Sequence, residues 1–117
     1  MLAKDQVGID GENLAARHLV GAGLEIVTRN WRCPVGEIDI VALDGRELVI
    51  VEVKTRTSTT YGDPVEAVTY RKQRKLRELA ALWLKANPHR GSVRFDVITV
   101  LYPKRGYPQL EHWRGAF

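Results

Sequence analysis

The sequence contains a single cysteine, Cys33, so no disulfide can form within the chain and no cysteine-rich zinc site can assemble. This usage is consistent with a reducing compartment. No segment approaches the run of about 20 apolar residues that spans a bilayer. The first residues include the charged Lys4 and Asp5, where a signal peptide would need an apolar run. We therefore expect a cytoplasmic protein without a membrane partner.

The sequence also lacks the residue patterns of several other kinds of site. The three histidines, His18, His89 and His112, are scattered without metal-ligand spacing, and no Ser-His-Asp arrangement can be identified. The pair Gly21 and Gly23 follows a predicted helix rather than a strand, which argues against a dinucleotide-binding loop. We expect neither a histidine metal site nor a serine-nucleophile enzyme.

The composition is that of an ordinary globular protein. The 117 residues are 44% hydrophobic and 27% charged, without internal repeats or low-complexity blocks, and they fit one domain over 1–117. Lys and Arg number 18 against 14 acids, a net charge of +4, and 12 of these bases are arginine. Arginine forms forked contacts to planar anions such as phosphate, so the balance suggests a nucleic-acid partner.

The hydrophobic periodicity predicts an α/β domain. Helical spacing places Glu12, Ala15, Ala16, Leu19 and Val20 on one face, and Leu76, Leu79, Ala80, Trp83 and Leu84 on another. The second helix has two candidate starts, the capping pattern at 63–66 and Thr69. The expected order is helix, three strands, helix, then one or two strands, in a mixed sheet flanked by helices. The predicted elements are a helix over 6–22, strands over 24–31, 37–43 and 46–54, a helix ending near 86, and strands over 92–101 and 109–113.

The strands on either side of Asp44-Gly45 carry the most informative pattern. Asp-Gly between alternating apolar residues predicts a hairpin. A two-residue loop pairs Leu43 with Arg46, whereas a four-residue loop pairs Leu43 with Leu48. Both registers place four charged side chains on one face, and a three-residue loop would separate them. These side chains are Glu37, Asp39, Glu52 and Lys54.

Carboxylates in such a position require either a proton or a nearby positive charge. Glu52 lies in a strand apolar enough to be central, and buried carboxylates either take up protons or pair with positive charge. Lys54 supplies one charge, and a divalent metal would supply more. Glu12 adds a further acid on the core face of the first helix. The alternative is a structural Glu52–Lys54 pair, with Asp39 at a strand edge and Glu12 reaching solvent.

The second helix begins with a basic cluster. Five bases fall within seven residues, and no acid follows before Glu78. We interpret the cluster as a phosphate-backbone contact, and the alternative is a solvated helix face. Arg56 follows the lysine of the strand and is a further candidate for the substrate groove. The nucleic-acid-binding candidates are Arg56, Arg71, Lys72, Arg74 and Lys75.

These residues resemble two related groups. Glu12, Asp39 and Glu52-Val53-Lys54 resemble the PD-(D/E)xK nuclease superfamily, although Ile38 stands where that pattern has proline. Nearly the whole chain is similar to the YraN-like family of small bacterial proteins, itself similar to archaeal Holliday junction resolvases. The segments that carry this closer resemblance are Gly11-Glu12 with Ala15, 36–41, 51–56, 94–97 and Ala116-Phe117.

The resemblance implies a restriction-endonuclease-like core and a role for each acid. Asp39 and Glu52 would bind Mg²⁺ or Mn²⁺ directly, and Glu12 directly or through water. Lys54 would serve the attacking water. Glu37 would be an outer-shell acid. Related nucleases also use a polar residue of the second helix near the site, which makes Lys72 and Gln73 candidates.

Three functions compete at this point. The first is a metal-dependent endonuclease acting on DNA, in particular branched or structured DNA. Symmetric cleavage of a junction would require a homodimer. The second is a nucleic-acid-binding module that has the nuclease fold but little activity. The third is a protein-interaction module, which leaves the acidic cluster unexplained.

Overall fold

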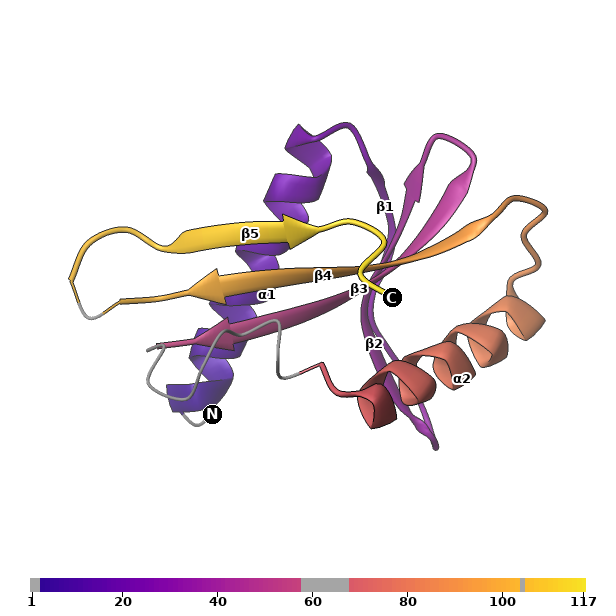
Figure 1. Cartoon of the computed structure of the whole chain (residues 1–117), viewed down its shortest axis with the longest axis horizontal. Helices are drawn as coiled ribbons and strands as arrows, with labels where there is room; N and C mark the ends of the chain where they lie inside the picture. The colour runs from indigo at the N-terminus through magenta and orange to yellow at the C-terminus, as the bar shows by residue number, and fades with distance from the viewer. Residues whose placement is uncertain (1–2, 58–67, 104) are drawn as a thin grey trace.

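The computed structural model describes residues 3–57, 68–103 and 105–117. The described chain forms a five-stranded mixed sheet with two helices (Figure 1), as the hydrophobic periodicity predicts. Neither of these helices is long and apolar enough to cross a membrane. The elements are α1 (Ala3–Gly21), β1 (Glu25–Cys33), β2 (Gly36–Asp44), β3 (Glu47–Arg56), α2 (Tyr70–Ala86), β4 (Val93–Leu101) and β5 (Gln109–Trp113).

The strands are arranged in the order β1-β2-β3-β4-β5. Only the β3–β4 pair is parallel among the described strands, and α2 provides the crossover between them. The helices cover opposite faces of the sheet. Val49 and Val51 of β3 pack in the cluster of α1, whereas Leu48 and Ile50 pack in the cluster of α2. This division follows from the alternation of side chains along a strand.

Most of the predicted helix faces are confirmed. Ala15 and Leu19 of α1 are fully buried, as are Leu76 and Leu79 of α2 to within 1%. The prediction for Val20 is wrong, because its side chain is 59% exposed. Val20 lies about 100° around the helix from Leu19, which turns it past the edge of the buried stripe.

The start of α2 is at the second of the two predicted positions. Thr69 is the N-cap, and its side-chain oxygen accepts a hydrogen bond from the Lys72 backbone N–H at 3.2 Å. The alternative start at 63–66 lies outside the described residues.

The β2–β3 hairpin has the register in which Leu43 pairs with Leu48. Asp44 pairs with Glu47, and Gly45, at φ 62°, lies in the turn between them. The described ladder ends at the pair Ile40–Val51. Asp39 and Glu52, the next residues in this register, therefore lie where the two strands separate.

Strict alternation is also interrupted at this point. Ile38 and Val41 both belong to the cluster of α2, whereas Ile40 belongs to the cluster of α1. The prediction that Glu37, Asp39, Glu52 and Lys54 share one regular face therefore holds only in part. Asp39 lies between Ile38 and Ile40, where the alternation of β2 is interrupted, and it interacts electrostatically with both Glu52 of β3 and Glu12 of α1.

Close packing fixes where α1 crosses β3. Gly11 is buried, and a Cβ built on it would lie 2.9 Å from both Cβ and Cγ2 of Thr55. Only glycine permits this approach, which brings the neighbouring Glu12 near the end of the β2–β3 ladder. Gly8, one turn earlier, has open space at the same position.

A second buried network holds the other end of α1. Asp96 is completely buried and accepts hydrogen bonds from Arg94 at 2.9 and 3.0 Å and from the Gly115 N–H at 2.9 Å. His112 Nε2 lies 2.7 Å from Asp96, and its Nδ1 lies 3.1 Å from His18 Nε2. Burial opposes the charge of Asp96, but these hydrogen bonds hold its pKa below the usual value.

Substitution of Gly11 by alanine tests the close crossing. Gly11→Ala is expected to destabilise the protein by about 1–2 kcal/mol, because overpacking against Thr55 outweighs the gain in helix propensity. Gly8→Ala is the matched control and is expected to stabilise by about 0.5–1 kcal/mol. Urea unfolding measures both changes, and equal effects of the two substitutions would contradict the packing argument.

Candidate functional site

Glu52 is the most deeply buried acid of the candidate site. Its residue is 5% exposed, on the face of β3 that α2 covers. The Nζ of Lys54 lies 3.6 Å from Glu52 Oε1, and the Nζ of Lys72 lies 3.5 Å from the same oxygen. Two ammonium groups from different elements, β3 and α2, thus share one carboxylate oxygen. The charge of Glu52 is compensated from both sides.

Asp39 has much less compensation. Its Oδ2 accepts a hydrogen bond of 2.8 Å from the Val53 backbone N–H, where the β2–β3 ladder has ended. Burial, followed by the negative charge of Glu52, raises the pKa of Asp39 to about 7, although the Val53 hydrogen bond acts to lower it. Near neutral pH this carboxyl is therefore divided between its neutral and charged forms.

Glu12 approaches the same place from α1. Burial raises the pKa of Glu12, and Glu37 and Glu52 add to this effect, while the positive charge of Arg29 opposes it. The Asn30 amide, oriented with its nitrogen toward the carboxylate, donates to the two oxygens of Glu12 at 2.9 and 3.2 Å. Asn30 has φ 53°, a left-handed conformation that asparagine tolerates better than most residues.

Glu37 lies at the exposed rim. Its carboxylate pairs with Arg32 Nε at 3.1 Å, and both side chains are largely exposed. It nevertheless raises the pKa of both Asp39 and Glu12. Glu37 therefore acts electrostatically on Asp39 and Glu12, although its own side chain lies at the exposed rim.

The donor set suits a hard divalent cation with few protein ligands. Within the described residues, no three His, Cys, Asp or Glu side chains form a ready metal cage. Mg²⁺ commonly uses one or two carboxylates and retains several waters, so Asp39 and Glu52 are sufficient donors of the right chemistry. The raised pKa of Asp39 is the property of a carboxyl that a cation would stabilise in its charged form.

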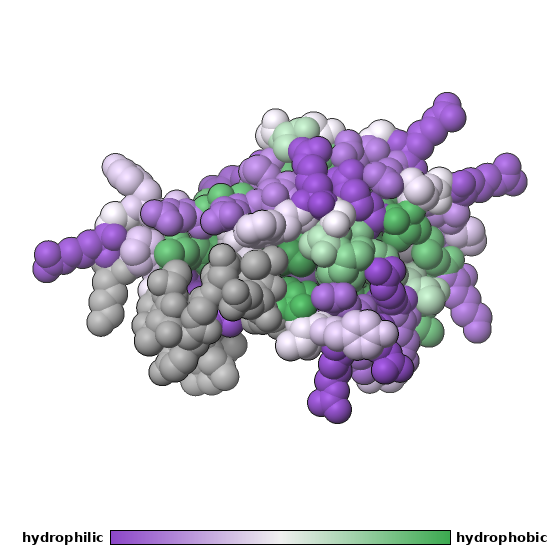
Figure 2. Space-filling view, viewed as in Figure 1, coloured by the Kyte–Doolittle hydropathy of each residue, from purple (hydrophilic) through white to green (hydrophobic). Residues whose placement is uncertain are grey.

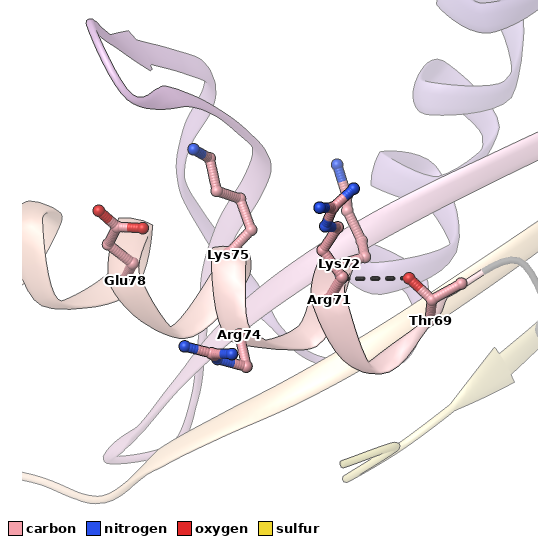
Figure 3. Close-up of a pocket in the computed structure, with 6 residues that line it drawn as sticks. All are labelled: Thr69, Arg71, Lys72, Arg74, Lys75 and Glu78. Carbon is pink, nitrogen blue, oxygen red and sulfur yellow. Dashed lines mark hydrogen bonds between the residues drawn. The ribbon is translucent and has the colours of Figure 1, made fainter.

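The bases of α2 form an open pocket next to these acids. The pocket has a volume of about 810 Å³. In Figure 2, strongly hydrophilic side chains project from the α2 region of the surface. The close-up in Figure 3 shows basic side chains from successive turns of the helix. The lining residues are Thr69, Arg71, Lys72, Arg74, Lys75 and Glu78.

The β1–β2 hairpin lies beside this pocket. A Cβ built on Gly36 would be 3.7 Å from Lys75 Cε and 3.6 Å from a methyl of Leu79, so the hairpin packs against α2. Arg32 and Glu37 line a neighbouring depression with Cys33 and Gly36. Basic side chains therefore lie on both the helix and the hairpin.

Two predicted residues are placed away from the acids. Gln73 donates from its side-chain amide to the Val68 carbonyl at 3.2 Å, which ties down the start of α2. Arg56 is at the end of β3, where its carbonyl accepts a hydrogen bond from the Tyr102 N–H at 2.7 Å. Among the described contacts, neither side chain reaches Asp39, Glu52 or Glu12.

Sequence reasoning missed three residues of this region. Arg29 and Asn30 act on Glu12, and Arg32 pairs with Glu37. Asparagine is disfavoured in strands, so Asn30 inside a predicted strand was a usable indication of an irregular position. The two arginines carry no comparable pattern.

Comparisons with known proteins place the chain among relatives of similar length. A family model described as "Uncharacterised protein family UPF0102" matches residues 11–100. A UPF0102 protein of Frankia casuarinae is 54% identical over 118 residues, which covers all of both chains. One from Beutenbergia cavernae is 53% identical over 117 residues, or 99% of each chain. One from Rhodococcus jostii is 52% identical over 112 residues, or 95% of each chain.

The raised pKa of Asp39 predicts a pH-dependent stability. Asp39 binds a proton more readily in the folded protein than in the unfolded chain. Its protonation therefore stabilises the folded protein at low pH, and this stabilisation is lost as the pH rises through about 7. Between pH 5 and pH 8, in the presence of a chelator, the wild type is expected to lose roughly 2–3 kcal/mol relative to Asp39→Asn.

Urea unfolding of both proteins across this range measures the difference. Comparison with the asparagine variant cancels the titration of the histidines and other groups that the two proteins share. If the difference in unfolding free energy between the two proteins stayed constant from pH 5 to pH 8, the pKa of Asp39 would be the same in the folded and unfolded states, which would contradict the prediction.

Proposed function

Since the chain belongs to the uncharacterised protein family UPF0102, the YraN-like family, we propose its function from the site: a divalent-metal-dependent endonuclease that hydrolyses phosphodiester bonds in DNA. One observation carries the proposal. Two carboxyl groups, the buried Glu52 and the half-buried Asp39, lie where neighbouring strands separate, and Lys54 is held 3.6 Å from Glu52. A purely structural core gains little from two acids in this position.

The arrangement supports the predicted likeness to PD-(D/E)xK nucleases. The element order is helix, three strands, helix and two strands, with a mixed sheet between the helices. Asp39 lies on the second strand, Glu52 and Lys54 on the third, and Glu12 on the first helix. These positions match the sequence motif, which supports our proposal of a restriction-endonuclease-like core.

Asp39 and Glu52 would hold Mg²⁺ or Mn²⁺, with Glu12 as a direct or water-mediated ligand. When bound, such an ion acts as a Lewis acid on a phosphoryl oxygen and lowers the pKa of coordinated water. The Val53 N–H fixes one oxygen of Asp39. Asn30 and Arg29 orient and stabilise Glu12.

The two lysines have different environments. Lys54 lies on the same strand as Glu52 and is 30% exposed, which places its ammonium between the acids and solvent. There it would stabilise the charge of the attacking hydroxide and of the phosphorane. Lys72 belongs to α2 and also lines the basic pocket, where a phosphate would bind.

The substrate class follows from the basic surface. Arg71, Arg74 and Lys75 are exposed on α2, beside the acids, with Arg32 on the neighbouring hairpin. Such groups contact phosphates without reading bases, which suits recognition of DNA by shape, including branched DNA. Symmetric cleavage of a branched substrate would use a homodimer with two such sites.

A nucleic-acid-binding module with little activity is the second candidate. It is favoured by the lysines on Glu52, since Lys54 and Lys72 already neutralise this acid without a metal. The raised pKa of Asp39 argues for the nuclease instead. Both lysines contact Glu52, so they do not neutralise the site as a whole. A divalent cation would stabilise the charged form of Asp39 as well.

Cleavage of end-labelled linear, flapped and four-way-junction DNA with Mg²⁺ or Mn²⁺ tests the enzyme proposal. Wild type is expected to cut at least one substrate, and Asp39→Asn and Glu52→Gln to lose activity at least about 100-fold, since each removes a charged ligand. Glu111→Gln, an exposed acid on β5, is the control and should keep full activity. No cleavage by folded wild type, with DNA still bound, would favour the binding module.

Salt-dependent DNA binding tests the basic surface separately. The double variant Arg71→Gln/Arg74→Gln is expected to reduce the slope of log affinity against log salt by about 2, one for each lost phosphate contact. Lys85→Gln/Arg90→Gln removes the same charge from exposed positions outside the pocket. Fluorescence anisotropy from 50 to 200 mM salt measures both, and equal slopes for the two variants would refute a local phosphate contact.

A further inference from the structure

Lys72 contacts a buried acid and also lines the basic pocket. Its Nζ lies 3.5 Å from Oε1 of the buried Glu52, and its side chain also lines the open basic pocket of α2. Lys75 lines the same pocket one turn further along but has no ion pair among the described salt bridges. In Figure 3, both side chains rise from the same side of the helix. Lys72 is therefore the basic residue that links the pocket to the acids.

The oxygen that Lys72 contacts is shared. Lys54 lies 3.6 Å from Oε1 of Glu52, so two ammonium groups contact the same oxygen atom. A divalent cation on this carboxylate would face two positive charges nearby. Coulomb repulsion between the cation and these ammonium groups is reduced if one ammonium moves away when the cation binds.

Lys72 is the group that can withdraw. Its side chain is 37% exposed, and it extends from a helix rather than from the strand that carries Glu52. A flexible four-carbon stem lets its ammonium move by several ångströms toward the pocket. Lys54 lies two residues from Glu52 on the same strand, so the base of its side chain stays next to the acid, and it does not line the pocket.

We infer that Lys72 is a switch residue that neutralises Glu52 in the metal-free protein and is released by the metal to bind a substrate phosphate. This inference rests on the proposed metal-dependent function. It makes metal and nucleic acid bind cooperatively through one side chain, with the coupling equal in both directions. The protein would hold DNA most tightly when the metal is present.

The inference predicts an unusual effect of removing a base. Lys72→Met is expected to raise the affinity for Mn²⁺ alone by about two- to fivefold, because the metal no longer displaces an ion pair of this modest strength. Lys75→Met removes the same charge from the same helix and should change Mn²⁺ affinity by less than about twofold. Isothermal titration calorimetry with Mn²⁺ and the full chain measures this, and Lys72→Gln repeats it with a polar side chain.

DNA binding provides the second readout. The gain in affinity for a short DNA duplex on adding Ca²⁺, a hard cation with similar oxygen ligands, is expected to shrink in Lys72→Met and to persist in Lys75→Met. Anisotropy with Ca²⁺ or chelator gives this ratio without requiring cleavage.

These outcomes distinguish the Lys72 switch from the nuclease proposal on which it rests. Mn²⁺ binding by wild type with unchanged or weaker binding by Lys72→Met overturns the switch and leaves the nuclease proposal in place. Absence of Mn²⁺ binding in wild type, with Glu52→Gln behaving identically, overturns both. Tighter Mn²⁺ binding together with a reduced Ca²⁺ effect on DNA supports the switch.

Discussion

Asp39 and Glu52 lie at neighbouring positions of β2 and β3, and the need to compensate their negative charges organises the surrounding structure. The β2–β3 ladder ends before Asp39 and Glu52 would pair directly, which avoids opposed like charges within the sheet. The Val53 N–H that the ladder no longer uses donates to Asp39 instead. Glu52 takes ammonium groups from Lys54 and Lys72.

Both helices contribute to this arrangement by how closely they approach the sheet. Gly11 lets α1 lie directly on Thr55, which brings Glu12 to the acids, and the buried Asp96 network holds the other end of the helix. On the opposite face, α2 begins at Thr69, so that Lys72 reaches Glu52 within its first turn. The site thus depends on packing that is distributed over most of the fold.

Much of this was available from the sequence. The helical stripes of Leu76 and Leu79, the alternation around Glu52, and the Asp-Gly turn predicted a mixed α/β sheet with the acids and Lys54 near one another. The turn allowed two registers that preserve the cluster, and pairing statistics could not choose between them. The structure has Leu43 opposite Leu48, which places Asp39 and Glu52 at corresponding positions.

The sequence by itself determined the local elements and the residue types of the site, because side-chain periodicity reflects which face of a strand or helix is buried. Only the tertiary structure decided the irregular step at Asp39, the separation of the strands, and the partners of Glu52. It also assembled the chain Asp96–His112–His18 from residues that are far apart in the sequence. Such contacts depend on how elements pack across the sheet, and no local pattern encodes the distance between them.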